Sequence, residues 1–201
     1  MTYATVRRLC FPLFTARLAR VDGSEHIPEP PYVIASNHVD FLDGFYLAAA
    51  FFRARGHTPL FLTKTDNYRW TSATIPIDPD RPGATLDVAL DRLRAGSIIC
   101  NFPEGHRNHT DRIGEGKTGT VRLARLAGVP VVPVGLAGGA HPRLFVGSLW
   151  HLVRGGHPVI VRIGRPIRFA AGPAADPTTL HTQTNELMRT IAALCGKRVG
   201  L

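Results

Sequence analysis

The sequence contains the stretch Val33-Ile34-Ala35-Ser36-Asn37-His38-Val39-Asp40-Phe41-Leu42-Asp43-Gly44, in which an apolar run gives way to polar residues. A short apolar run of this kind predicts a buried strand, and a helical pattern follows over Gly44–Arg55, which stops before Gly56. Ligands of open α/β sheets bind in the crevice beyond the carboxyl ends of the strands. The polar residues of this stretch are therefore the first candidates for a functional site.

The same succession of short β-branched runs and longer helical patterns continues along the chain, which predicts an α/β fold. Pro/Gly-rich stretches at Ile27–Pro31 and Ala170–Pro177 are expected to be connections within one domain. We expect strands at Tyr32–Ser36, Leu60–Thr63, Thr74–Ile77, Ser97–Phe102, Val131–Val134 and Val159–Ile163. We expect the other helices at Ala84–Ala95, Thr118–Ala127 and from Pro177, capped by Asp176, to the residue before Gly196.

The composition fits one folded domain. The chain has 201 residues, of which 44% are hydrophobic and 19% charged, enough for a single sizeable core. Its three cysteines, Cys10, Cys100 and Cys195, form no close-spaced pair. This favours a reducing, cytosolic setting over a disulfide framework. No apolar run reaches the roughly 18–20 residues needed to cross a bilayer.

The charge is strongly basic. Lys and Arg number 24 against 15 Asp and Glu, a net charge of +9. This balance favours an anionic partner, such as nucleic acid, an acidic membrane surface or a phosphorylated substrate. The alternative is that the arginines simply form a solvated surface.

Residues 1–20 mix apolar and basic side chains and are a candidate membrane-surface helix, with packing on the domain as the alternative. Pro12 is expected to interrupt this helix, and the arginines scatter around a helical wheel. We therefore expect two parts, an N-terminal segment of residues 1–20 and a domain of residues 21–201.

His38 and Asp43 are the first candidate pair for chemistry. They are five residues apart, about 140° around an ideal helix, so they can meet only if the chain turns between them. An aspartate at the helix start could then accept from the imidazole N–H and leave the other nitrogen to take a proton from an alcohol. The alternative is a capping aspartate near an incidental histidine.

A second strand end has the same character, in Ile98-Ile99-Cys100-Asn101-Phe102-Pro103-Glu104-Gly105-His106-Arg107. Glu104 and Arg107 could pair with each other, or Arg107 could hold a phosphate through its planar fork of donors. Gly105 would let the backbone approach a ligand closely. The alternative is a turn closed by a salt bridge.

Taken in order, these stretches resemble the lysophospholipid acyltransferase family. Asn37-His38-x4-Asp43 resembles the family's first block and Phe102-Pro103-Glu104-Gly105-x-Arg107 its third. Three further segments add to the resemblance, which runs from about Val21 to Pro166: Val21–Pro28 before the first block, Gly116–Gly119 as the Lys-x-Gly segment, and Val129–Val134 as the fourth block.

The resemblance implies a fold, a chemistry and partners. The fold is a single α/β domain with a mixed, mostly parallel β-sheet flanked by helices. The chemistry is transfer of a fatty-acyl group from acyl-CoA or acyl carrier protein to a hydroxyl of a lysophospholipid such as 1-acylglycerol-3-phosphate, without cofactor or metal. His38 would be the base and Asp43 its orienter. The substrate-binding residues would be Asn37, Lys64, Arg81, Glu104, Gly105 and Arg107.

The sequence departs from the family pattern where the resemblance places the acceptor. In the second block, Arg81 is displaced by two residues from its usual place after Asp78. In the third block, His106 stands where Thr or Ser is usual, and Asn108 stands where Ser is common. A glycolipid or a natural-product alcohol therefore stays an alternative acceptor.

Two other functional classes have less support in the sequence. A metal-dependent hydrolase would need ligands from among His38, Asp40, Asp43, His106, His109 and Asp111, which show no established ligand spacing. A non-catalytic binder of nucleic acid or of an anionic membrane would depend on the net charge. A nucleic-acid binder would also need aromatic residues interleaved with the arginines, and they are not laid out in that way. We expect an enzyme in the cytoplasm, peripheral on the inner face of the cell membrane and bound to its anionic surface, with no nucleic-acid partner.

Overall fold

A computed structural model describes residues 2–64, 72–78, 80–140, 142–155, 157–172 and 176–200, which are built around one seven-stranded sheet. The strand order is β1-β8-β7-β2-β5-β3-β4. These strands are β1 (Leu18–Asp22), β2 (Val33–Ser36), β3 (Leu60–Lys64), β4 (Thr74–Ile77), β5 (Ile99–Asn101), β7 (Val131–Gly138) and β8 (Val159–Ile163). The two short strands β6 (Arg112–Ile113) and β9 (Arg198–Val199) pair separately.

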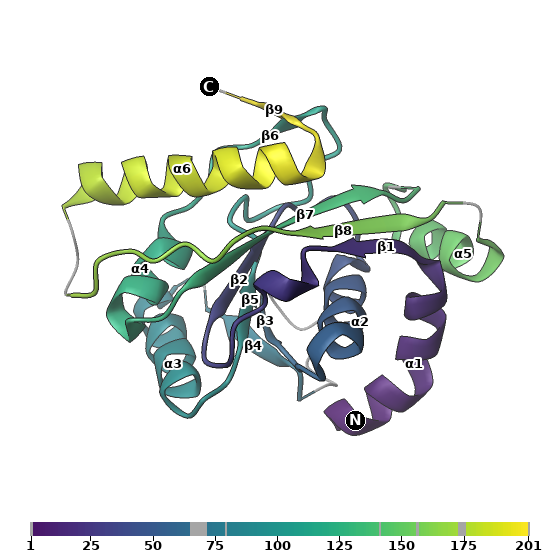
Figure 1. The fold of residues 1–201 in the computed structure, drawn as a ribbon, viewed down its shortest axis with the longest axis horizontal. Helices are drawn as coiled ribbons and strands as arrows, with labels where there is room; N and C mark the ends of the chain where they lie inside the picture. The colour runs from purple at the N-terminus through teal and green to yellow at the C-terminus, as the bar shows by residue number, and fades with distance from the viewer. Residues whose placement is uncertain are drawn as a thin grey trace.

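The sheet is mixed and mostly parallel, which confirms the expected fold class. β7, β2, β5, β3 and β4 run parallel, β8 is antiparallel to β7, and β1 is parallel to β8. The helices that cover it are α1 (Tyr3–Arg17), α2 (Asp43–Arg55), α3 (Pro82–Arg94), α4 (Gly119–Ala127), α5 (Phe145–Arg154) and α6 (Pro177–Cys195), with a short 3₁₀ helix at Ser24–His26 (Figure 1).

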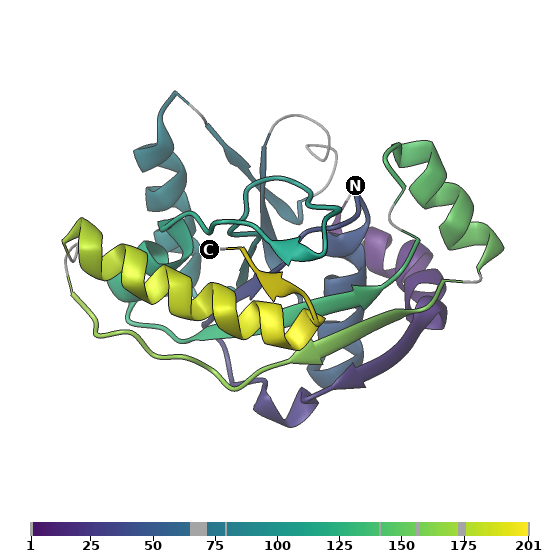
Figure 2. The same cartoon turned by 90° about the horizontal axis from the view of Figure 1, so that it is seen from above.

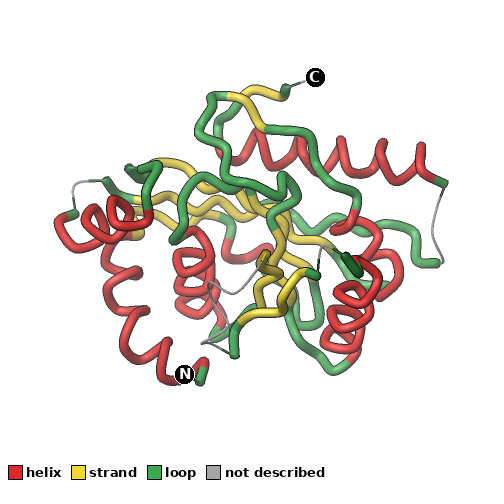
Figure 3. The backbone as a smooth tube through the Cα atoms, turned by 180° about the vertical axis from the view of Figure 1, so that it is seen from behind, coloured by secondary structure: helices red, strands yellow, loops and turns green. Residues whose placement is uncertain are grey.

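The strands bury both faces, so two hydrophobic cores form. Successive side chains of a strand point to opposite faces. In β2, Ile34 therefore packs with α1, α2 and α5, while Val33 and Ala35 pack with α3, α4 and α6. Figure 3 shows the two groups of helices on opposite sides of the sheet. Burial on both faces explains why β2 reads as a continuous apolar run.

Most predicted elements are present with small changes of boundary. β4 and β8 have the predicted bounds, whereas β7 continues four residues beyond the predicted end at Val134. Gly135 makes this extension compatible with α6, because a Cβ there would lie 2.4 Å from the backbone of Leu194 and Cys195. β1, β6, β9 and α5 were not among the predicted elements, whereas α1 corresponds to the candidate helix in residues 1–20.

The N-terminal residues are packed on the domain. The prediction that Pro12 interrupts the segment is wrong, since α1 runs through it from Tyr3 to Arg17. Proline removes one helical hydrogen bond, and the burial of Phe11 and Phe14 offsets this loss. The Phe14 ring stacks on the Phe45 ring of α2, with ring centroids 5.1 Å apart. The boundary expected at residue 20 falls inside β1, which is hydrogen-bonded to β8. Among the described residues, no helix has the length and apolar character needed to span a membrane.

Candidate active site

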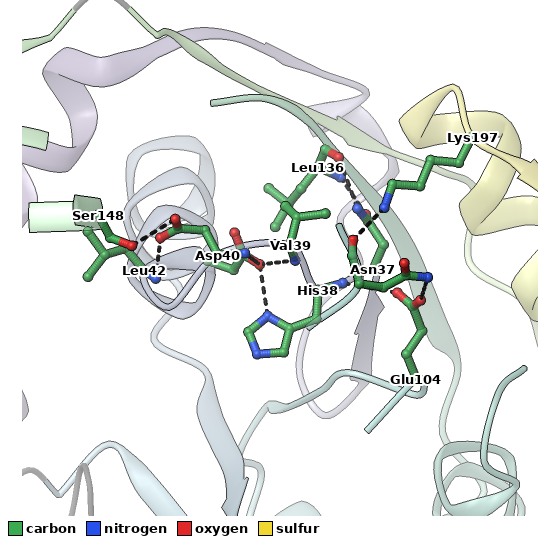
Figure 4. Close-up of polar contacts among 11 residues, drawn as sticks. Asn37, His38, Val39, Asp40, Leu42, Glu104, Leu136, Ser148 and Lys197 are labelled. Carbon is green, nitrogen blue, oxygen red and sulfur yellow. Dashed lines mark hydrogen bonds and ion pairs between the residues drawn. The ribbon is translucent and has the colours of Figure 1, made fainter. Parts of the chain in front are cut away.

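The two polar stretches meet at one edge of the sheet. β2 and β5 are parallel neighbours, with Ala35 opposite Asn101, so the loops that follow them lie together. The backbone N–H of Asn108 donates to the carbonyl of His38 at 2.7 Å, which joins the loops directly. Figure 4 shows the residues that converge there.

His38 and Asp43 form a hydrogen-bonded pair, because the chain turns between them as their spacing requires. His38 Nδ1 lies 2.8 Å from Asp43 Oδ2. The same oxygen accepts from the backbone N–H groups of Val39 at 2.7 Å and Asp40 at 2.8 Å. Asp43 is the first residue of α2, so its carboxylate also lies at the positive end of the helix dipole. Because a carboxylate can only accept hydrogen bonds, Nδ1 is the nitrogen that donates to Asp43.

The imidazole is held on a second side by an aromatic ring. Phe102 stacks on His38 with ring centroids 4.2 Å apart and planes 17° apart. The His38 side chain keeps 21% of its surface exposed, and its Nε2 has no hydrogen-bond partner among the described residues. In the neutral imidazole, Nε2 is therefore the nitrogen with the lone pair, and the ring that carries it has a fixed orientation.

Glu104 is a structural residue in this arrangement. Its side chain is 1% exposed, and Oε1 accepts from the His38 backbone N–H at 3.2 Å. Oε2 accepts from Asn108 Nδ2 at 2.6 Å and from the Gly114 backbone N–H at 2.9 Å. The expected contact of Glu104 with a substrate, or with Arg107, is replaced by these three bonds, which hold the histidine loop in place.

Asn37 is also a positioning residue. Its side chain is fully buried, donates to the Leu136 carbonyl at 3.0 Å and accepts from the Leu136 N–H at 2.7 Å. This pair of bonds fixes the end of β2 to β7. Because the amide is fully buried and bonded to β7, the expected contact of Asn37 with a substrate does not fit the geometry.

The guanidinium of Arg107 is placed so that it could bind an anion. Its guanidinium carbon lies 3.3 Å from the centroid of the Phe41 ring, so the planar fork is held against an aromatic face. Nη1 is buried, and no described group hydrogen-bonds to it. Because a buried charged donor is costly without a partner, an anionic ligand is the natural complement.

The side chain of Lys117 lies beside Gly105. Gly105 has φ +70°, and a Cβ there would lie 3.0 Å from Cε and 3.2 Å from Nζ of Lys117. The Lys117 backbone N–H also donates to the Pro103 carbonyl at 2.9 Å. Lys117 is thus a second cation beside this loop, which the sequence reasoning did not select although it lies in the Lys-x-Gly segment.

Arg81 lies away from the other predicted residues. It precedes α3 beyond β4, three strands from β2, or roughly 14 Å at the usual strand spacing. Its guanidinium donates to Asp78 at 3.0 Å, and this bond lowers the pKa of the Asp78 carboxyl. Lys64 ends β3, next to β5, and its side chain is outside the described residues.

A further link runs from the histidine loop to α5 and was not foreseen from the sequence. Asp40 Oδ1 accepts from the Leu42 N–H at 2.8 Å, and Oδ2 accepts from the Ser148 hydroxyl at 2.9 Å. Only the folded chain brings these residues together, since Ser148 is 108 residues from Asp40.

The side chains proposed as metal ligands do not converge. Asp40 is engaged by Ser148 and Leu42, and Asp111 pairs with Arg198. Across the described part of the chain, no three His, Cys, Asp or Glu side chains are grouped as metal ligands would be.

Curated relatives of this chain are acyltransferases by name. It is 31% identical over 125 residues to the probable 1-acyl-sn-glycerol-3-phosphate acyltransferase of Mycoplasma pneumoniae, covering 57% of this chain and 47% of that one. The human 1-acyl-sn-glycerol-3-phosphate acyltransferase alpha is 32% identical over 123 residues, covering 57% and 44%. The match spans less than half the length of each of these relatives.

A solved structure shares the fold. The crystal structure of the 1-acyl-sn-glycerophosphate (LPA) acyltransferase PlsC from Thermotoga maritima superposes with a TM-score of 0.62 over 95% of this chain and 78% of that one, at 21% identity. The family model described as Acyltransferase matches residues 19–137, which include both polar stretches and more than half of the chain. The resemblance expected from the motifs is confirmed, and this chain belongs to the Acyltransferase family.

Proposed function

We propose that this protein transfers a fatty-acyl group from a thioester donor to a hydroxyl of a lysophospholipid, with His38 as general base. The observation that carries the proposal is the orientation of His38 by Asp43 and Phe102, which leaves Nε2 as the nitrogen with the lone pair. A base in this state can accept the proton of an alcohol within hydrogen-bond reach.

The proposed acyl transfer needs only the two substrates and the His38 imidazole. The hydroxyl proton passes to Nε2 of His38 as the hydroxyl oxygen bonds to the thioester carbonyl carbon. The C–S bond then breaks, and the leaving sulfur takes the proton back from the imidazolium. The carboxylate of Asp43 stabilises the imidazolium that forms between the two transfers.

Direct transfer is favoured over a covalent acyl-enzyme, because Cys100, Tyr46 and Ser36, the alternative groups beside the His38 loop, are buried. Burial raises the pKa of the Cys100 thiol, with the nearby charge of Asp43 adding to the effect. Burial, followed by the charges of Asp40 and Asp43, raises the pKa of Tyr46 to about 12. The Ser36 hydroxyl is fully buried and, among the described groups, has no base bonded to it.

A Cys100→Ala variant should therefore keep the transfer rate of the parent enzyme. It should lose only about 1 kcal/mol of stability, because a small buried group is removed from the core. Steady-state kinetics and thermal unfolding measure the two effects. A fall in kcat as large as that expected for loss of the base would point to an acyl-cysteine intermediate instead.

We place the acceptor's phosphate on Arg107, with Lys117 beside it. Arg107 offers a buried, unpartnered Nη1, and Lys117 Nζ approaches Gly105 in the same loop. The names of the relatives favour 1-acylglycerol-3-phosphate as this acceptor. The donor in this proposal is acyl-CoA or acyl carrier protein, and a lipid acceptor implies work at the anionic, cytoplasmic face of a membrane.

An Arg107→Ala variant should raise KM for 1-acylglycerol-3-phosphate by about 10–100-fold, since a hydrogen bond to a charged group contributes about 1.5–3 kcal/mol. Mass spectrometry of the products, with acyl-CoA or acyl carrier protein as donor, measures transfer to 1-acylglycerol-3-phosphate and to 1-acylglycerol in parallel. The effect should be confined to the phosphorylated acceptor.

Arg81→Ala is the matched control, because this arginine is exposed and paired with Asp78. It should leave both KM values unchanged. An equal loss for both acceptors in the Arg107 variant would remove the phosphate assignment. If the parent enzyme gave no product from 1-acylglycerol-3-phosphate or from other lysophospholipids, the proposed function itself would be wrong.

A further inference from the structure

Helix α5 presents an apolar face to solvent. Six large hydrophobic side chains are exposed there: Leu144, Phe145, Val146, Leu149, Trp150 and Val153, which we call the α5 ridge. Val146 is 74% and Trp150 58% exposed. The opposite side of α5 is the buried one, where Ser148 and Leu152 face the domain.

The ridge is continuous and follows the helical repeat. Val146, Trp150 and Val153 are spaced by four and three residues and therefore share one stripe, with Phe145 and Leu149 forming the next. The outer face of a helix on a globular protein is normally polar, so a contiguous apolar face of this kind marks an interaction surface. Figure 2 shows α5 at the periphery of the molecule, beyond the sheet.

The chain segment that carries the ridge has basic residues and no acidic ones. The sequence has no Asp or Glu between Glu115 and Asp176. Arg143 and Arg154 flank the ridge, and the Arg154 guanidinium lies 5.3 Å from the centroid of the Trp150 ring. Apolar residues with a tryptophan, bordered by arginines, are typical of a helix that lies in the interface of an anionic bilayer.

The ridge is fixed to the domain and adjoins the candidate active site. Arg17 of α1 donates to the carbonyls of Leu152 and Val153 at 2.8 Å each, which holds the end of α5. At the start of α5, the Phe145 ring makes an edge contact with the Phe41 ring, with ring centroids 5.7 Å apart. The Arg107 guanidinium lies over this same Phe41 ring. A bilayer on the ridge would therefore lie next to Arg107.

We propose that the α5 ridge is the surface by which this protein docks on an anionic lipid bilayer. The apolar side chains enter the interface, and Arg143 and Arg154 contact the headgroups. Docking itself depends only on these groups. Its consequence, delivery of a lysolipid headgroup to Arg107, rests on the proposed function.

The test is flotation of the full chain with liposomes of equal parts phosphatidylglycerol and phosphatidylcholine. A Val146→Glu/Trp150→Glu variant should bind about 100-fold more weakly, roughly tenfold for each apolar side chain withheld from the interface. The matched control is Leu9→Glu/Leu13→Glu, which changes two exposed leucines of α1 and should still float. Thermal unfolding should be unchanged in both, since all four side chains are exposed.

Fluorescence gives a second readout at the ridge. In a Trp70→Phe background Trp150 is the remaining tryptophan, and its emission should shift to the blue on addition of these liposomes but not of pure phosphatidylcholine liposomes. No acyl donor is present in either experiment, so the result is independent of catalysis.

Unchanged flotation of the Val146/Trp150 variant, or loss confined to the α1 variant, would overturn the proposal. A lipid-free dimer that this variant converts to monomer, without any change in flotation, would assign the ridge to a second copy of the chain. Loss in both variants would support the α5 ridge and extend the docking surface onto α1.

Discussion

Replacing His38 with alanine should lower kcat for acyl transfer by about 10²–10⁴-fold, the usual contribution of a positioned general base. The loss follows because Nε2 of His38 is the nitrogen with the lone pair, in a ring held by the bond of Nδ1 to Asp43 and the stacking of Phe102. KM for the acceptor should change little, since the substrate's charged group is assigned to Arg107.

The fold should survive this substitution. The His38 side chain is partly exposed, and the hydrogen bonds that hold its loop, from Glu104 and Asn108, are made to its backbone. Thermal unfolding of the variant should therefore stay close to that of the parent protein. Near-normal turnover by a correctly folded His38→Ala protein would end the assignment of the base.

The sequence predicts those helices and strands that are specified by residues close together in the chain. β2, β4 and β8 are short β-branched runs, and α6 has a capping Asp176 and a periodic apolar face, so neighbouring residues carry the information. β1 reads Leu-Ala-Arg-Val-Asp and is a strand because it pairs with β8 far along the chain. α5 lacks the polar outer stripe that would mark a surface helix, because its exposed face is apolar.

The site divides in the same way. The pairing of His38 with Asp43 could be predicted, because both residues lie in one turn and the family resemblance gives them roles. The roles of Asn37 and Glu104 could not, because their partners come from other strands and loops. Asn37 bonds to Leu136, 99 residues away, and Glu104 to the backbone of His38, 66 residues away. A motif identifies such residues without telling whether they touch the substrate or hold the loop that does.

Glu104→Ala should separate these two roles, and it should be the most destabilising of the substitutions considered. Its carboxylate satisfies the His38 N–H, the Gly114 N–H and the Asn108 amide inside the protein. Each donor left without a partner costs about 1–3 kcal/mol, so the loss for the three donors should be about 3–9 kcal/mol. Domains of this kind are stable by only about 5–15 kcal/mol. A fall in Tm of about 10 °C or more is expected.

The kinetic effect of the same change distinguishes positioning from substrate binding. If Glu104 holds the His38 loop, kcat should fall because the imidazole is no longer fixed, while KM should stay nearly constant at a temperature where the variant is folded. Glu104→Gln is the matched control, because it keeps the side-chain shape and one acceptor oxygen. In this variant an NH₂ group replaces only one of the two carboxylate oxygens, and the other oxygen still accepts. Both the stability and kcat should therefore fall less than in Glu104→Ala. A raised KM with unchanged Tm in both variants would instead make Glu104 a substrate ligand, which its burial among three donors argues against.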